Sequence, residues 1–228
     1  MGVIWMSKVR TNTQFVTVPA ASTFTSFGVT TFDPIFTAVR AALPDGAYIG
    51  GGYLTSLLAK IPVGDIDVWF RDEAAYTETR TRVLRLTSLE LREKASPRLA
   101  GTTFVGLAGK VSLNAFEYFS SPEETIDSFD FTVAQLALVG TNLIVGPTTL
   151  ADIRAKELVL HREEFTILSR AEKYLKKGFA PGEKSWEKFA QLAGPTTLQL
   201  TNIRRKLARA APVPNPHQND LATPVNNE

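Results

Sequence analysis

A chain of 228 residues with 44% hydrophobic side chains can bury the core of one large domain or of two small ones, which excludes disorder throughout. It has no cysteine and only two histidines, which excludes disulfides, iron–sulfur clusters and Cys- or His-based zinc sites, so any metal must have oxygen ligands, as Mg²⁺ or Mn²⁺ has. The net charge of +2 hides a division: residues 1–151 hold 12 Lys and Arg against 14 Asp and Glu, whereas residues 152–209 hold 13 against 7.

No apolar run reaches the roughly 20 residues of a membrane-spanning helix, and the N-terminus lacks the pattern of a signal peptide. We therefore expect a cytoplasmic protein that does not enter a membrane. The basic C-terminal third beside an acidic remainder favours a protein that binds a polyanion, although a solvated lysine-rich helix face would produce the same charge.

The chain opens with a segment that has no helical periodicity. Residues 1–30 are rich in Thr, Ser and Val, so we predict an irregular segment with one strand near Phe15–Val18. Asp33 followed by Pro34 predicts a helix start, because Asp favours the N-cap and Pro the first turn. The turn residues of Pro44–Gly46 end this helix.

A strand, a glycine turn and a helix come next. Ala47–Ile49 predicts a short strand that runs into Gly50-Gly51-Gly52, and the apolar residues after the glycines have helical spacing. Pro62–Gly64 turns the chain back. Asp65–Phe70 then alternates between polar and apolar residues, which predicts a second strand.

The remaining elements alternate between strands and helices. Residues 72–94 predict a helix followed by a strand, and further strands are predicted at Thr102–Leu107 and Lys110–Phe119. Ser121 with the Pro and two Glu after it predicts another helix start, and Gly140–Asn142 predicts a hairpin turn.

These elements predict an α/β fold, a mixed sheet with flanking helices, followed by a small all-helical domain. We place the sheet domain at residues 31–148, after the irregular segment of residues 1–30, and the helical domain at residues 149–211. Residues 212–228 are rich in proline and polar side chains, which predicts a disordered tail.

Asp65 and Asp67 are the strongest catalytic candidates. Residues two apart on a strand point to the same side, roughly 7 Å apart, so the two carboxylates can share divalent cations that neutralise their repulsion. Such a pair suits a two-metal centre that activates an attacking hydroxyl and stabilises the leaving oxygens of a phosphoryl displacement. By itself an Asp-x-Asp pattern is weak, because most such pairs lie in turns or on the surface.

The glycine turn strengthens this interpretation. Gly51 and Gly52 let the backbone approach a ligand closely, and the helix after them offers N–H groups and the positive end of its dipole to a phosphate. Twelve residues separate Gly52 from Asp65, enough for one short helix and a turn to bring the chain back beside the first strand. The alternative is a glycine turn that only packs helix against strand.

The segment Ile49–Val68, Gly-Gly followed by Asp-x-Asp, resembles the signature of the DNA polymerase beta-like nucleotidyltransferase superfamily, and most of all its tRNA CCA-adding and bacterial poly(A) polymerase branch. Phe129–Ala134 is similar to that branch's Arg-Asp-Phe-Thr-hydrophobic-Asn motif, which binds the nucleotide near its ribose. Thr149–Arg154, followed by Leu168–Ala171 and Tyr174–Phe179, is similar to the stretch in which the branch enters its first helices. The resemblance covers roughly residues 47–180.

The resemblance implies a Mg²⁺- or Mn²⁺-dependent nucleotidyltransferase that moves a nucleoside monophosphate from an NTP to a hydroxyl, with an RNA 3′ end, such as that of a tRNA, as the expected acceptor. Asp65 and Asp67 would hold metal and catalyse the transfer. Gly51 and Gly52 would bind the triphosphate, and Asp130 would contact the ribose or a metal.

Other residues are assigned to nucleotide binding by position. Thr55 and Ser56 stand where the branch has an Arg-Asp pair, so a phosphate-orienting salt bridge is replaced by two hydroxyls. Arg154 and Arg170 are candidates for phosphate contacts because a guanidinium group grips phosphate oxygens bidentately, with a helix-surface ion pair as the alternative for each. Phe129 replaces the motif's Arg.

A third carboxylate has two candidates. Glu117, on the strand predicted at residues 110–119, and Asp130 could each serve as general base or metal ligand. We favour Asp130 because it also lies in the motif-like segment.

The densest basic stretches are candidates for weak contacts with an RNA acceptor, because lysine and arginine bind phosphates without sequence preference: Lys176, Lys177, Arg204 and Arg205. Two rival interpretations stay open. One is a catalytically inactive nucleotide- or RNA-binding module of the same fold, and the other is a toxin or defence nucleotidyltransferase that modifies a tRNA or a protein.

Overall fold

The computed structural model describes residues 13–86, 92–96, 101–106, 109–162, 167–182, 185 and 187. Its centre is an eight-stranded mixed sheet with the strand order β1-β8-β7-β2-β3-β6-β5-β4. The strands are β1 (Val16–Pro19), β2 (Ala47–Gly50), β3 (Ile66–Phe70), β4 (Arg92–Ser96), β5 (Gly101–Gly106), β6 (Gly109–Leu113), β7 (Leu136–Val139) and β8 (Asn142–Val145).

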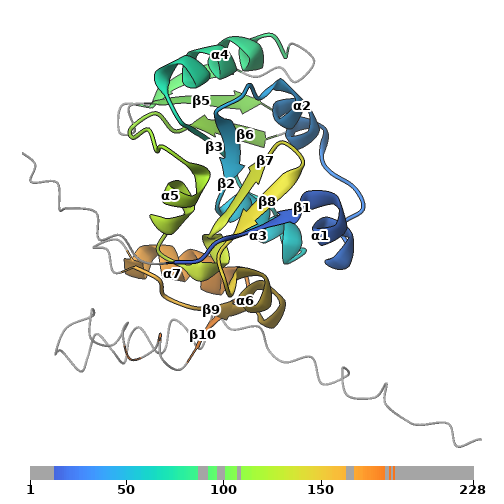
Figure 1. Cartoon of the computed structure of the whole chain (residues 1–228), viewed down its shortest axis with the longest axis vertical. Coiled ribbons are helices and arrows are strands. Elements are labelled where there is room, and N and C mark those ends of the chain that lie inside the picture. The colour runs from blue at the N-terminus through green and yellow to red at the C-terminus, as the bar shows by residue number, and fades with distance from the viewer. Residues whose placement is uncertain are drawn as a thin grey trace, which may run out of the picture.

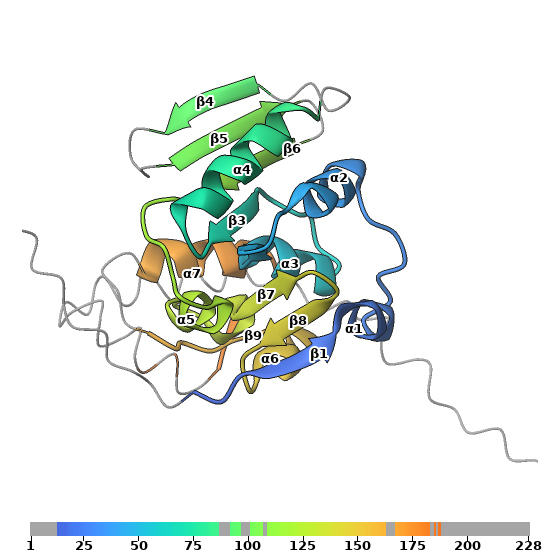
Figure 2. The same cartoon turned by 45° about the horizontal axis from the view of Figure 1, so that its top comes forward.

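Seven helices accompany this sheet in the described part of the chain: α1 (Ala20–Ser26), α2 (Pro34–Ala42), α3 (Gly52–Leu58), α4 (Glu73–Leu84), α5 (Pro122–Asp127), α6 (Thr149–Ala155) and α7 (Ile167–Lys176). Strands β4 and β5 lie at the opposite end of the molecule from α6 (Figure 1 and Figure 2). The predicted α/β architecture with a mixed sheet is confirmed.

Strand β3 determines which residues face the core and which face the candidate site. Its burial alternates, because Ile66, Val68 and Phe70 are buried whereas Asp67 and Trp69 lie on the opposite face. The alternation predicted from the sequence is therefore present, and Asp67 projects from a well-packed strand.

The partners of β3 place the glycine turn beside the acidic residues. Ile49 of antiparallel β2 lies opposite Val68, so β2 ends, at Gly50, next to the start of β3. On the other side, Asp67 is paired with Ser112 of parallel β6. Strand pairing thus brings the turn after β2 and the acidic start of β3 to the same place.

Local signals in the sequence set several element boundaries. Asp33 caps α2 by accepting the backbone N–H of Phe36 at 2.6 Å, and Ser121 caps α5 by accepting the N–H of Glu124 at 3.3 Å. The predicted hairpin at Gly140–Asn142 is confirmed, because β7 and β8 are antiparallel and joined by this turn.

The N-terminal segment is more regular than predicted. The expected strand is present as β1, paired with β8, but residues 20–26 form the helix α1 that the pattern did not predict. Four of its seven residues are Ser or Thr, whose hydroxyls donate to backbone carbonyls, as Thr23 does to Pro19 at 2.9 Å. Such residues are weak helix signals, and it is the burial of Ala20 and Phe24 that fixes α1 in place.

The strand predicted at Lys110–Phe119 is wrong beyond Leu113, where β6 ends. Glu117 therefore does not lie on a strand next to β3. The chain leaves the sheet here while Phe116 packs edge-on against Trp69, with ring centroids 5.5 Å apart.

The segment after residue 148 is described in part. Helices α6 and α7 fit the predicted helical character, and the short strands β9 (Glu157–Leu158) and β10 (Ala180–Pro181) pair in parallel beside them. The tail predicted at residues 212–228, like most of the predicted helical domain beyond α7, lies outside the described residues. None of the helices that the structure describes is long and apolar enough to cross a membrane.

Replacing the capping residue Asp33 tests the local stability of α2. Asp33→Ala removes the cap and the acceptor of the Tyr53 hydroxyl, and we expect a loss of about 1–3 kcal/mol in the free energy of unfolding, measured in urea. The control is Asp45→Ala in the exposed turn after α2. Equal stabilities of the two variants would contradict this account of the helix start.

Candidate active site

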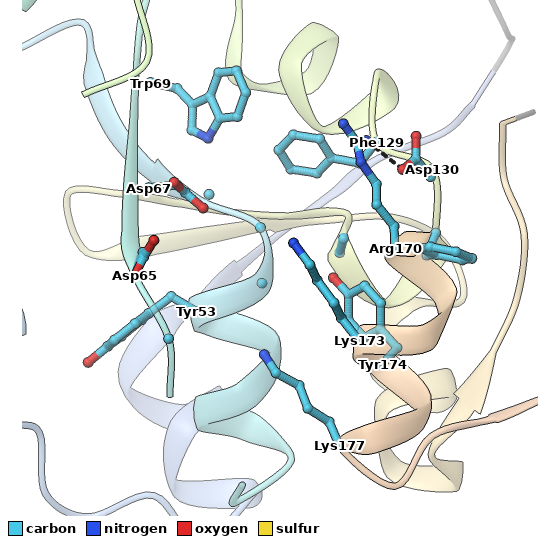
Figure 3. A pocket seen from close by; sticks show the side chains of 16 residues that line it. Tyr53, Asp65, Asp67, Trp69, Phe129, Asp130, Arg170, Lys173, Tyr174 and Lys177 are labelled. Atoms are coloured by element: carbon cyan, nitrogen blue, oxygen red, sulfur yellow. Dashed lines mark hydrogen bonds and ion pairs between the residues drawn. The ribbon is translucent and has the colours of Figure 1, made fainter. Parts of the chain in front are cut away.

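The glycine turn and the acidic start of β3 open into one cavity of about 480 Å³ (Figure 3). Four segments of the chain contribute its lining residues. These are Gly50, Gly51, Gly52 and Tyr53 from the end of β2 to the start of α3, then Gly64 and Asp65 just before β3 with Asp67 and Trp69 on it, then Phe129, Asp130, Phe131 and Ala134, and finally Arg170, Lys173 and Tyr174 on α7 with Lys177 directly after it.

The two β3 carboxylates differ in environment. Asp65 is exposed and forms an ion pair with Lys110. Asp67 is largely buried, and burial together with the charge of Asp65 raises the pKa of Asp67 to about 6, although Asn114, Lys110 and Lys173 act in the opposite direction. A divalent cation between the two carboxylates would offset the cost of burying that charge, so the pair has the chemistry of a cation site.

A third carboxylate does not accompany this pair. The position beside Asp67 on β6 is Ser112, followed on the same face by Asn114. Glu117 is absent from the residues that line the cavity. Among the described residues, no group of three or more His, Cys, Asp or Glu side chains could hold a metal.

The glycine turn has a backbone that other residues cannot adopt without strain. Gly51 has φ +82° and ψ −143°, and its N–H donates to the carbonyl of Leu136 at 3.0 Å. A Cβ at Gly51 would lie 3.5 Å from the ring of Phe129, and one at Gly52 would lie 3.6 Å from the hydroxyl of Tyr174. The missing side chains leave the turn's backbone open to the cavity.

Thr55 and Ser56, predicted to bind nucleotide, lie in α3 just beneath the cavity lining. Both are fully buried. The Thr55 hydroxyl donates to the carbonyl of Val133 at 2.6 Å, which ties α3 to the segment before β7. The Ser56 hydroxyl donates to the carbonyl of Gly52 and accepts from Lys177 Nζ, at 2.8 Å in each case.

Asp130 lies across the cavity from β3 (Figure 3). It is 3% exposed, and its Oδ2 accepts from Arg170 Nη1 at 2.5 Å. Its Oδ1 is buried without a hydrogen-bond partner among the described residues. The backbone carbonyl of Asp130 accepts from the N–H groups of His161 and Arg162, which fixes its place.

Phe129 and Trp69 form an aromatic wall between the two acidic positions, with ring centroids 5.5 Å apart. The Phe129 ring lies beside the glycine turn, 3.5 Å from where a Cβ at Gly51 would be, so the residue that replaces the motif's Arg supplies no charge there. The Trp69 indole N–H is buried and unpaired within the described part of the chain, and the ring lines the cavity.

Of the basic residues predicted to contact nucleotide or RNA, some line the cavity and others do not. Arg170 and Lys177 line the cavity. Arg154 lies elsewhere, with its guanidinium 4.3 Å from the ring centroid of Phe27. Lys176 points outward and pairs with Glu172 at 3.1 Å. Arg204 and Arg205 lie outside the described residues.

The sequence interpretation assigned no site role to several cavity residues, among them Tyr53, Trp69, Lys173 and Tyr174. The signals were present. Trp69 is two residues after Asp67 and so shares its strand face, and residues 170, 173, 174 and 177 have the spacing of a single helix face. The sequence did not show that this helix face packs beside α3 and the glycine turn.

Residues 24–156 match the Gabija anti-defense 2 family. The matched region contains the glycine turn, both β3 aspartates and Asp130, and it ends before α7. No curated protein sequence is significantly similar to the chain.

The fold is similar to those of CCA-adding enzymes. The TM-score is 0.63 at 15% identity for a CCA-adding enzyme in complex with ATP, over 85% of this chain and 54% of that one. It is 0.61 at 16% for the Thermotoga maritima enzyme with tRNA (84% and 50%) and 0.53 at 18% for the Bacillus stearothermophilus enzyme with CTP (78% and 51%). The chain spans about half the length of these structures. The expected nucleotidyltransferase fold is confirmed.

Alanine at Gly51 tests the glycine turn. The positive φ and the nearby Phe129 ring make Gly51→Ala costly, and we expect a loss of about 1–3 kcal/mol in the free energy of unfolding. Gly64→Ala is the matched control, because a Cβ at Gly64 meets no atom within 4 Å. Urea denaturation measures both, and a Gly51→Ala variant as stable as Gly64→Ala would refute the strained turn.

Proposed function

The chain belongs to the Gabija anti-defense 2 family, and from this membership, the fold and the cavity we propose that it is a metal-dependent nucleotidyltransferase. It moves a nucleoside monophosphate from an NTP to a hydroxyl acceptor and releases pyrophosphate. The observation that carries the proposal is that one cavity is lined both by the glycine turn and by the two β3 aspartates.

Each side of the cavity suits one part of an NTP. The glycine turn gives the phosphates access to backbone, as phosphate-binding turns before helices do. Arg170 holds Oδ2 of Asp130, and the buried Oδ1 has no hydrogen-bond partner among the described residues, so we assign Oδ1 to a ribose hydroxyl of the bound nucleotide. The aromatic wall of Phe129 and Trp69 lies between these two regions and offers an apolar surface to the nucleotide.

Asp65 and Asp67 would hold Mg²⁺ or Mn²⁺. Bound there, the cation would favour ionisation of the attacking hydroxyl and stabilise charge on the leaving oxygens. The acceptor oxygen attacks the α-phosphorus, the bond from that phosphorus to the bridging oxygen breaks, and the acceptor proton passes to water. Lys110 forms an ion pair with Asp65 and so restrains its carboxylate.

An RNA 3′ end is our first candidate for the acceptor. The excess of Lys and Arg in residues 152–209 supports a polyanionic partner, and one structural neighbour is a CCA-adding enzyme in complex with tRNA. Because the identity to that enzyme is 16%, the choice of NTP is not carried over.

A hydroxyl on a protein of the Gabija defence is the second candidate. The family description names an action against that defence, and transfer of a nucleotide to a defence protein would place a bulky, charged group on it. The chemistry at Asp65 and Asp67 is the same for both acceptors.

Label transfer tests the enzyme and separates the acceptors. The protein is incubated with Mg²⁺, α-labelled NTPs and either bulk RNA or the Gabija proteins, and we expect label in one of the two. Asp65→Asn and Asp67→Asn keep side-chain shape but remove charge, so each should lower incorporation roughly 100-fold or more. Asp45→Asn, in an exposed turn, is the control.

If the protein binds NTP but incorporates label into neither acceptor, it is a nucleotide-binding module and not an enzyme. Incorporation that survives both substitutions would place the chemistry away from β3.

The role of Asp130 is tested by Asp130→Asn. If Oδ1 accepts from the ribose, the preference for NTP over dNTP in binding falls about tenfold, because a hydrogen bond to a charged acceptor is lost. Asp127→Asn is the control, since Asp127 forms a partly buried ion pair with Arg162 outside the cavity. An unchanged preference, with weaker NTP binding only when Mg²⁺ is present, would instead assign Asp130 to the metal.

A further inference from the structure

Helix α7 presents a row of cationic side chains to the cavity. Arg170, Lys173 and Lys177 recur at helical spacing, and in Figure 3 the two lysines extend from α7 toward the glycine turn and β3. Arg170 and Lys177 mark the two ends of the row, seven residues and therefore about 10 Å apart along the helix axis.

The charges in the cavity are matched at Arg170 and unmatched at the lysines. Arg170 pairs with Asp130, and Asp65 pairs with Lys110. Within the described part of the chain, no carboxylate lies within ion-pair distance of the ammonium group of Lys173 or of Lys177. The next lysine on the helix, Lys176, faces outward and has its own partner in Glu172.

The position of Lys177 disfavours its positive charge. Its stem is half-buried, and its Nζ donates at 2.8 Å to the neutral hydroxyl of Ser56. Burial and the nearby charge of Lys173 lower the pKa of Lys177, and the charge of Asp65 opposes this shift only in part. Two ammonium groups held near each other in a partly buried site are stabilised when an anion lies between them.

The contact between Lys177 and Ser56 places a positive charge beside α3, which has no charged residue of its own at positions 55 and 56. In the resemblance drawn above, Thr55 and Ser56 stand where related enzymes carry an Arg-Asp pair that orients phosphate. Here Ser56 is the anchor of Lys177 instead. Positive charge therefore reaches this end of the glycine turn from α7, a helix that begins after the end of the region matched to the family.

We infer that Lys173 and Lys177 form the site for the pyrophosphate portion of the nucleotide, the two phosphates beyond the reacting α-phosphorus. This inference rests on the proposed function. The order along α7 supports it, because Arg170 with Asp130 marks the ribose end, and Lys177, whose partner Ser56 lies on α3 beyond the glycine turn, marks the far end (Figure 3). Lysine ammonium groups bind phosphate oxygens as point charges and need no fixed geometry.

The test compares binding of each NTP with that of its NMP, and binding of inorganic tripolyphosphate, in the full chain with Mg²⁺. Lys173→Ala and Lys177→Ala should each reduce the NTP-over-NMP preference about tenfold and weaken tripolyphosphate to a similar degree. Lys176→Ala removes the same charge from the outer face of α7 and should change neither. Lys177→Arg, which keeps the charge, should retain most of the preference.

Lys177→Gln guards against a folding defect, because it keeps a donor for Ser56 while removing the charge, and it should behave as Lys177→Ala does. An unchanged NTP-over-NMP preference in the Lys173 and Lys177 variants overturns the inference, as does wild-type protein that binds neither NTP nor tripolyphosphate. Loss of RNA binding alone in Lys177→Ala also overturns it, by assigning this lysine to the acceptor.

Failure of the proposed enzyme is distinguishable from failure of this site. A wild-type protein that transfers nucleotide, with lysine variants that keep their NTP-over-NMP preference, rejects the lysine site alone. Variants that lose the preference, in a protein that transfers nothing, support the lysine site and reject the enzyme.

Discussion

The antiparallel pairing of β2 with β3 is the constraint on which the candidate site depends. With Ile49 opposite Val68, β2 ends at Gly50 beside the first residues of β3. A slip of one residue would turn Asp67 toward the core and Val68 toward the cavity. The buried face of β3 prevents that slip, because Ile66, Val68 and Phe70 fill the core. Hydrophobic packing on one face of the sheet therefore fixes the position of acidic chemistry on the other.

Features carried by neighbouring residues were predictable from the sequence. The cap at Asp33, the glycine turn and the alternation of β3 each depend on a few adjacent side chains, and each is present in the fold. Features that depend on distant partners were not. The end of β6 at Leu113, which removes Glu117 from the site, and the approach of α7 to α3 are set by contacts between segments far apart in the chain.

The cavity brings the two aspartates and the glycine turn together. Phe129 and the Thr55-Ser56 pair stand where the resemblance places an Arg and an Arg-Asp pair, so these positions carry no cationic group. Helix α7 supplies cations from another direction. Electrostatic attraction to a triphosphate depends on where charge lies in space and not on which element carries it, so such an exchange can preserve substrate binding while the sequence diverges.

The central claim is that Asp65 and Asp67 hold divalent cations opposite a turn that binds the phosphates of an NTP. The most direct measurement is a crystal structure of the protein with Mn²⁺ and a non-hydrolysable NTP analogue, using the anomalous signal of manganese. The account predicts manganese bonded to oxygens of both aspartates, with the triphosphate along Gly51 and Gly52. Manganese bound at neither aspartate, or a triphosphate bound away from that turn, would contradict it.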